Sequence, residues 1–190
     1  MDELMALLRA HEITRLGDIR RVPRSRRHPH FSMDTLASSL PHAGVTYRHF
    51  PGLGGLRTPR RDSANTAWRH AGFRGYADYM ETPAFDASLG EFLEFAAYGR
   101  SVLMCAEGVW WRCHRQLVAD VLVARGLEVR HILSATSAPA HAMTAFSRVI
   151  DGKVTYQEFT IRNLQFTRRA CRSRGPQRHG YALSIVNCEL

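Results

Sequence analysis

The chain has 190 residues, of which 45% are hydrophobic, 9% aromatic and 23% charged. This length fits one domain, and the composition excludes a disordered chain, a collagen and a disulfide-dense mini-protein. Lys and Arg number 26 against 17 Asp and Glu, which gives a formal net charge of +9. This excess of positive charge indicates a polyanionic partner, nucleic acid first and a membrane surface second. The alternative is that it reflects only the base composition of the genome.

The hydrophobic spacing predicts helices that alternate with short strands. We expect helices over 2–10, from Ser32 to just before Gly44, and over 76–80, 83–97 and 114–125. Strands are predicted over 13–19, 45–49, 101–105 and 128–132, and a C-terminal hairpin over 145–150 and 153–159, turned by Asp151-Gly152. This order predicts an α/β layered single domain with a mostly parallel sheet. In such sheets, ligands collect at the carboxyl ends of the strands.

The positive charge is concentrated near the C-terminus. Residues 160–190 hold six Arg and one Glu, whereas residues 1–159 carry a net charge of +4. Residues 162–178 have no amphipathic period and are predicted to form a solvated basic arm. Residues 181–186 are either a short strand or part of a loose end. We therefore divide the chain into an α/β domain over 2–159 and a basic C-terminal tail over 160–190.

The sequence shows no signal-peptide pattern and no apolar run near the roughly 18 residues that a membrane helix needs. We therefore expect a cytoplasmic protein without a membrane partner; the sequence does not determine the oligomeric state. The four cysteines are too few for a disulfide scaffold, so Cys105 and Cys113 are expected to be reduced thiols.

The strongest local signal for chemistry is the stretch CAEGVWWRCHR, from Cys105 to Arg115. A strand delivers Cys105, and a helix is predicted to open near Cys113. Cations and a helix start stabilise a thiolate, so either cysteine is a candidate nucleophile or ligand, unless both are simply core thiols. The candidate catalytic residues here are Cys105, Glu107, Cys113 and His114, with Arg112 and Arg115 as anion-binding residues.

No cofactor is predicted at this cluster. Zinc or another metal at Cys105, Cys113 and His114 is the lesser alternative. Two observations count against a metal. The spacing is not a paired C-x2-C, and the adjacent Cys113 and His114 are expected to point in different directions on a helix.

A second candidate site follows the first predicted strand. Five arginines occupy eight positions from residue 20 to residue 27, a pattern suited to bidentate phosphate binding or to a solvated loop. Arg20, Arg24 and Arg26 are the anion-binding candidates, and Asp18 would orient one of them or act as a general base. Residues 51–70 form a long loop rich in Gly and Pro, in which Trp68 either stacks on a base or anchors the loop to the core.

These motifs together resemble the bacterial domain-of-unknown-function family numbered 488. The matching stretches are LLRAHEITRLGDIR, PRSRRHPHF, GVTYRHFPGLGG, FRGYADYM, MCAE, WRCHR, VLVARGLEVRHI and MTAFSRV, which together cover roughly residues 2–159. The resemblance implies an α/β domain with its polar motifs on one side and no settled biochemical role. The polar positions that match the motifs are Asp18, Arg20, Arg26, Cys105, Glu107, Cys113, His114 and Arg115.

The chain departs from the family in two places. Members usually begin with a strand that ends in Gly-His-Ser, whereas this chain starts inside the following helix. The tail after Phe159 has no family counterpart. The two departures are linked if residues 181–186 take the position of the absent strand, and pairing of this segment at a sheet edge would rule the link out.

Three functions remain open. The first is an enzyme, a hydrolase or a transferase, that acts on a nucleotide, a nucleobase or a nucleic-acid-derived phosphate ligand. The second is a non-enzymatic nucleic-acid-binding module, which predicts binding that weakens steeply with salt. The third is a truncated family member with impaired function. The clustering of polar residues at strand ends favours the enzyme, with an anionic small molecule or nucleic acid as the partner.

Overall fold

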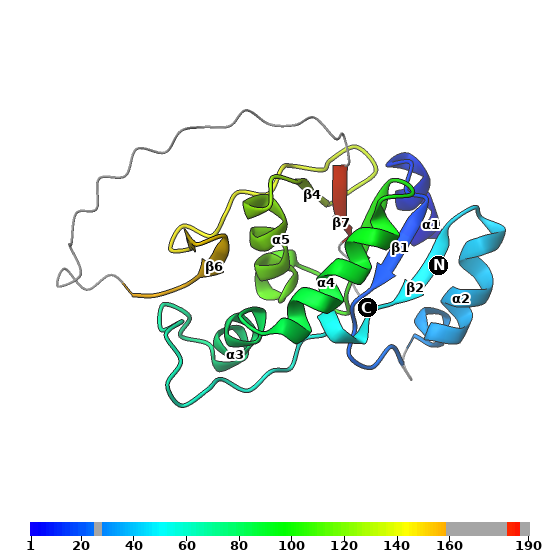
Figure 1. Ribbon diagram of the computed structural model, residues 1–190. Helices are drawn as coiled ribbons and strands as arrows, with labels where there is room; N and C mark the ends of the chain where they lie inside the picture. The colour runs from blue at the N-terminus through cyan, green and yellow to red at the C-terminus, as the bar shows by residue number, and fades with distance from the viewer. Residues whose placement is uncertain (25–27, 159–181, 187–190) are drawn as a thin grey trace.

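The computed structural model describes residues 1–24, 28–158 and 182–186 of the chain. Five parallel strands form the main sheet in the order β2-β1-β3-β7-β4 (Figure 1). These strands are β1 (Arg15–Asp18), β2 (Thr46–His49), β3 (Ser101–Met104), β4 (Glu128–Ile132) and β7 (Ala182–Val186). The structure therefore confirms the predicted α/β layered fold with a mostly parallel sheet.

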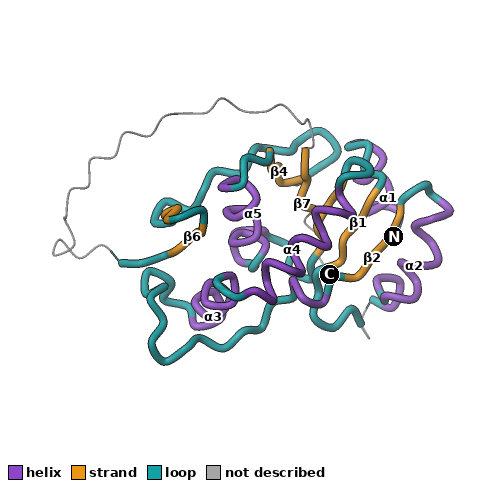
Figure 2. Tube along the Cα trace, in the orientation of Figure 1, coloured by secondary structure: helices purple, strands orange, loops and turns teal. Residues whose placement is uncertain are grey.

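Helices cover both faces of this sheet (Figure 2). Within the described ranges, the α-helices are α1 (Asp2–Ala10), α2 (Met33–His42), α3 (Ala71–Met80), α4 (Pro83–Ala96) and α5 (Arg115–Ala124). Single 3-10 turns lie at η1 (Pro29–Phe31), η2 (Pro51–Leu53) and η3 (Trp110–Arg112). Apolar residues of α1 and α2 form the core on one face, and those of α3, α4 and α5 form the core on the other.

Strand β3 shows why both faces must be covered, because all four of its residues are buried. Val102 and Met104 belong to the core beneath α1 and α2, whereas Leu103 belongs to the opposite core. A strand with two buried faces reads as a continuous apolar run rather than an alternating one. Helix α4 packs closely on the sheet at Gly17, where an added Cβ would lie 2.9 Å from a ring carbon of Phe92.

Local sequence signals account for four of the helix ends. The hydroxyl of Ser32 accepts a hydrogen bond from the backbone of Thr35 at the start of α2, and Thr82 caps α4 in the same way. Gly44 and Gly126 follow α2 and α5 with φ values of 75° and 83°, which is the left-handed conformation that ends many helices.

The predicted hairpin is present but shorter than expected. It consists of β5 (Arg148–Ile150) and β6 (Lys153–Thr155), which pair antiparallel. Asp151 and Gly152 form its turn with φ values of 49° and 77°, as a two-residue hairpin turn requires. Val154 of β6 joins the core around α5.

Strand β7 lies inside the main sheet. It pairs in parallel with β3 on one side and with β4 on the other, so it is not at a sheet edge. Of the two possibilities left open for 181–186, a short strand is the one observed, as Ala182–Val186. The division of the chain at residue 159 stays a prediction, and the basic arm over 162–178 lies outside the described residues.

Helix α3 begins at Ala71, five residues before the predicted start. The reason is an unusual cap, because Nδ1 of His70 accepts a hydrogen bond from the backbone of Gly72. In the described part of the chain, no helix has the length and apolar character to cross a membrane.

Candidate functional site

Two strand ends and one helix start surround a pocket of about 360 Å³. Strand β1 ends at Asp18 and leads to Arg20, strand β3 ends at Met104 and leads to Cys105, and α5 begins at Arg115. Because β1 and β3 are neighbouring parallel strands, their carboxyl ends lie at the same edge of the sheet. Six of the predicted site residues line this pocket, namely Arg20, Cys105, Glu107, Arg112, Cys113 and His114.

Cys105, Cys113 and His114 form a cluster at the base of α5, which we call the thiol–imidazole cluster. The Nδ1 atom of His114 lies 3.6 Å from the Sγ atom of Cys113 and 4.0 Å from that of Cys105. All three donor atoms lie within 4.8 Å of one another. The two cysteines are buried, and neither forms a disulfide, as the sequence predicted.

The adjacent side chains of Cys113 and His114 converge because the chain turns sharply between them. Cys113 has an extended backbone, with φ −127° and ψ 150°, whereas His114 has φ −58° and ψ −13° and begins the helix. Cys113 therefore lies before α5 rather than on it. The expectation that the two side chains point in different directions is wrong for this reason.

The two sulfur atoms differ in their proton affinity. A hydrogen bond with Cys113 raises the pKa of Cys105 well above its usual range, and burial of the thiol adds to this effect. The same hydrogen bond lowers the pKa of Cys113 well below its usual range, helped by His114 and Arg115 and opposed by burial. Cys113 is thus the more acidic of the two thiols, and His114 and Arg115 favour its thiolate form.

Arg115 is a fully buried cation behind the thiol–imidazole cluster. Its Nε atom donates a hydrogen bond of 3.4 Å to the Sγ atom of Cys113, and its Nη2 atom donates to the backbone carbonyl of Glu107. Arg115 does not line the pocket. It supports the loop between β3 and α5 and places a positive charge beside Cys113.

Asp18 holds Arg20 in position at the pocket. Both carboxylate oxygens of the buried Asp18 accept from the guanidinium, with an Nη2–Oδ2 distance of 2.6 Å. Tyr47 donates a hydrogen bond of 2.8 Å to the same carboxylate. Burial opposes the charge on Arg20, but Asp18 raises the pKa of Arg20 above its usual value. Burial, with Asp18 beside it, also raises the pKa of Tyr47.

Like Arg115, the predicted anion-binding residues Arg24 and Trp68 do not line the pocket. Arg24 is exposed on the loop after β1, and Arg26 lies outside the described residues. The ring of Trp68 stacks on Phe73 at 4.7 Å and meets Tyr156 edge-on. Trp68 therefore packs against the core, which is one of the two roles predicted for it.

Several pocket residues were missed as site candidates. Three of them, His70, Phe73 and Tyr76, line the pocket from α3 and its cap. They were not predicted because α3 begins earlier than the hydrophobic spacing indicated. Gly55 also lines the pocket, and a Cβ added there would lie 2.8 Å from Nδ1 of His114. The Gly54-Gly55 pair in the sequence was the available signal for this close approach.

A buried polar chain supports the turn η3, which precedes Cys113. His131 stacks on Trp110 with ring centroids 3.8 Å apart, and its Nε2 atom lies 2.8 Å from Nδ1 of His141. His141 in turn contacts Asp120 at 2.9 Å. Burial lowers the pKa of His131 to about 3, which keeps its ring neutral against the indole. This chain fixes the turn that carries Arg112 into the pocket.

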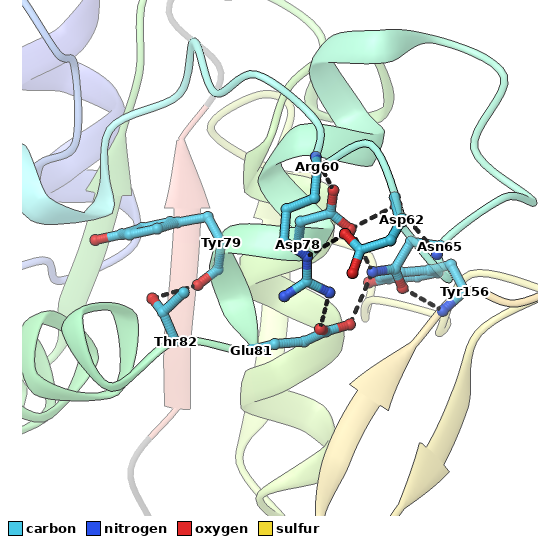
Figure 3. A network of polar contacts seen from close by, with 9 residues as sticks. Arg60, Asp62, Asn65, Asp78, Tyr79, Glu81, Thr82 and Tyr156 are labelled. Atoms are coloured by element: carbon cyan, nitrogen blue, oxygen red, sulfur yellow. Dashed lines mark hydrogen bonds and ion pairs between the residues drawn. The ribbon is translucent and has the colours of Figure 1, made fainter.

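Loop 51–70 is attached to α3 by a second polar network (Figure 3). Asp78 accepts hydrogen bonds from the backbone of Arg60 and from the side chains of Ser63 and Asn65. Glu81 accepts from Asn65 and Arg60. These contacts hold residues 60–65 of the loop on α3. They thereby restrict the path of the preceding segment, which carries Gly55 to the pocket.

We expect Asp78→Asn to lower the free energy of unfolding at pH 7 by about 1.5–3 kcal/mol, because a charged acceptor of several hydrogen bonds is lost. Burial would raise the pKa of Asp78, but its three hydrogen-bond donors together lower it. The stabilisation is therefore complete above the unfolded pKa of about 3.9 and is lost as pH falls through the lower folded pKa. Urea unfolding at several pH values measures it, and the difference between the two proteins should shrink below about pH 4.

Asp62→Asn is the matched control, because the Asp62 side chain is 90% exposed and lies 3.9 Å from Arg60. Its effect should be close to zero at every pH. An Asp78→Asn effect as small as that of the control would show that the network does not stabilise the fold.

Comparison with known proteins gives one match. A family model described as a domain of unknown function, DUF488, matches residues 1–122, from α1 to near the end of α5. This stretch contains every residue of the thiol–imidazole cluster together with Asp18 and Arg20. No curated protein and no solved structure matches the chain.

Proposed function

The chain belongs to the DUF488 family, and from that premise we propose that the pocket is the active site of an enzyme acting on a phosphate-bearing ligand of the nucleotide class. One observation carries the proposal. Two cysteines, two histidines, one glutamate and three arginines line one pocket at the carboxyl edge of a parallel sheet.

Arginines and a helix start make the pocket suitable for an anion. The hydrogen bonds to Asp18 use Nε and Nη2 of Arg20, which leaves Nη1 for a ligand. Arg112 lines the same pocket and is exposed, and α5 begins beside it at Arg115. Guanidinium groups bind phosphate in a bidentate fork, and a helix N-terminus favours negative charge.

The other pocket residues supply reactive groups and an aromatic wall. The thiol–imidazole cluster provides the reactive centre, and the exposed carboxylate of Glu107 is available to move a proton. Phe73 and His70 contribute aromatic rings to the lining, and such rings suit a planar base. Asp18 acts through Arg20, since it does not line the pocket itself.

Calorimetric titration with inorganic phosphate and with adenosine 5′-monophosphate tests the anion site. We expect both to bind and Arg112→Gln to weaken the affinity at least about tenfold, because a charge-assisted hydrogen bond is lost. Arg61→Gln is the control, since Arg61 is exposed and does not line the pocket. Absence of binding, or equal effects of both variants, would contradict the proposal.

A catalytic test uses the p-nitrophenyl esters of phosphate and of thymidine 5′-phosphate. We expect the paired Cys105→Ser and Cys113→Ser changes to reduce kcat/KM by about a hundredfold or more, as expected when the reactive group is removed. Unchanged turnover in that variant would refute the proposed enzyme. Salt-sensitive binding of a single-stranded oligonucleotide that ignores Arg112→Gln would instead favour the non-enzymatic module.

A further inference from the structure

We propose that Cys105, Cys113 and His114 bind one zinc ion whose fourth coordination position opens into the pocket. The inference deepens the proposed function, since it names the cofactor of the same site and gives the two sulfur atoms the role of ligands. Its test measures metal content rather than turnover, so the two proposals can fail separately.

The donor atoms lie close to the spacing of a tetrahedral site. Zinc–sulfur bonds of about 2.3 Å and zinc–nitrogen bonds of about 2.0–2.1 Å place neighbouring S and N donors about 3.6 Å apart and two S donors about 3.8 Å apart. Nδ1 of His114 lies 3.6 Å and 4.0 Å from the two sulfur atoms, and no pair exceeds 4.8 Å. Shifts of less than about 1 Å would complete the three bonds.

The chemistry of the donors selects the metal. Two thiolates and an imidazole are a soft donor set, which suits zinc rather than magnesium or calcium. Two thiolates also neutralise the charge of Zn²⁺, so the complex carries no net charge in a buried place. Arg115 supplies the supporting contact, because its Nε–H donates to the Sγ atom of Cys113, as groups around a metal commonly do for its ligands.

We place the fourth position on the pocket side of the cluster. All three donors line the pocket together with Glu107, and the absence of a Cβ at Gly55 leaves room beside Nδ1 of His114. Three protein ligands and one open position distinguish a catalytic zinc site from a closed structural one. A water molecule or a phosphate oxygen held by Arg20 and Arg112 would occupy that position.

The experiment measures zinc in the 190-residue chain, purified with any histidine tag removed, by mass spectrometry of the metal. We expect one equivalent per chain, and a more than tenfold lower content after Cys105→Ser, Cys113→Ser or His114→Ala. Cys171→Ser is the thiol control and should retain the metal. Circular dichroism verifies that each variant is folded.

Cobalt substitution gives a second measurement that needs no variant. The metal-free protein should bind one Co²⁺ and develop thiolate-to-cobalt charge-transfer absorption with the intense visible bands of a tetrahedral site. Absence of these bands, or zinc retained after both cysteines are replaced, would overturn the assignment. One equivalent of iron or copper lost in the same variants would overturn the choice of zinc.

Arg112→Gln separates the two proposals. It should leave the zinc content unchanged while weakening phosphate binding, because Arg112 lines the pocket without belonging to the thiol–imidazole cluster. Zinc without phosphate binding would refute the proposed function alone. Phosphate binding by a chain that takes up neither zinc nor cobalt would refute the metal site alone.

Discussion

A chain that ends at Glu158 is expected to lose the cooperative unfolding transition of the 190-residue chain. Removing β7 takes away the partner of β3 and the partner of β4 in the main sheet, since β7 pairs with both. Both faces of β3 are buried. Without β7, the edge of β3 that β7 normally pairs with would carry unpaired backbone groups inside the core. The loss should exceed the roughly 5–15 kcal/mol that stabilises a typical domain.

A matched control separates β7 from the segment that precedes it. In this control a Gly/Ser linker of the same length replaces residues 159–181, and 182–190 are kept. Thermal unfolding followed by circular dichroism should give a cooperative transition for the linker variant and none for the shortened chain. If the shortened chain melts cooperatively at nearly the same temperature, β7 is not needed for the fold.

The same measurement bears on the hypothesis of an impaired, truncated family member. That hypothesis predicts poor folding of the 190-residue chain and rescue by an added N-terminal strand. A strand inside the sheet at Ala182–Val186 leads us to expect cooperative unfolding without any addition.

The second large effect is expected from Asp18→Ala, which should lower the free energy of unfolding by about 3–5 kcal/mol. The change removes the partner of Arg20, whose side chain is only 4% exposed, and leaves a buried cation without compensation. It also removes the acceptor of the Tyr47 hydroxyl. Urea unfolding followed by circular dichroism measures the loss.

Two comparisons make this prediction specific. Asp86→Ala breaks the exposed ion pair with Arg125 and should cost about 0–1 kcal/mol. The double change Asp18→Ala with Arg20→Met should recover much of the lost stability, because no unpaired charge remains. If the double variant is as unstable as Asp18→Ala alone, lost packing rather than the unpaired charge of Arg20 causes the loss of stability.

Much of the fold followed from the sequence because its signals are local. Apolar spacing marked the helices, Gly44 and Gly126 marked two helix ends, and Asp151-Gly152 marked the hairpin turn. The early start of α3 did not follow, since it depends on a capping hydrogen bond that His70 accepts from Gly72 rather than on a common cap residue.

The candidate site was predictable in its location but not in its detail. Strand-end positions indicated that Arg20 and Cys105 would meet, because parallel strands end at one edge. The convergence of Cys113 and His114 depends on the backbone angles at one residue, which no spacing reveals. Arg115 was expected to bind an anion, yet its tertiary contacts bury it completely.

The buried chain through Asp120, His141 and His131 was missed for a different reason. Its members come from α5, β4 and the loop after β4, so only the folded topology brings them together. No short motif in the sequence carries that information. Buried titratable groups of this kind are found from the structure and not from patterns along the chain.

The internal position of β7 has a consequence for how the protein is made. Among the strands of the described residues, β4 has β7 as its sole neighbour in the main sheet, and β7 comes last in the sequence. During synthesis, the edge of β3 that faces away from β1 and the edge of β4 that pairs with β7 therefore stay unpaired until residue 186 has left the ribosome. Unpaired edges of this kind invite association between chains. We expect nascent chains stalled before Ala182 to bind chaperones and to resist proteases poorly, and protection to appear only once the last strand is available.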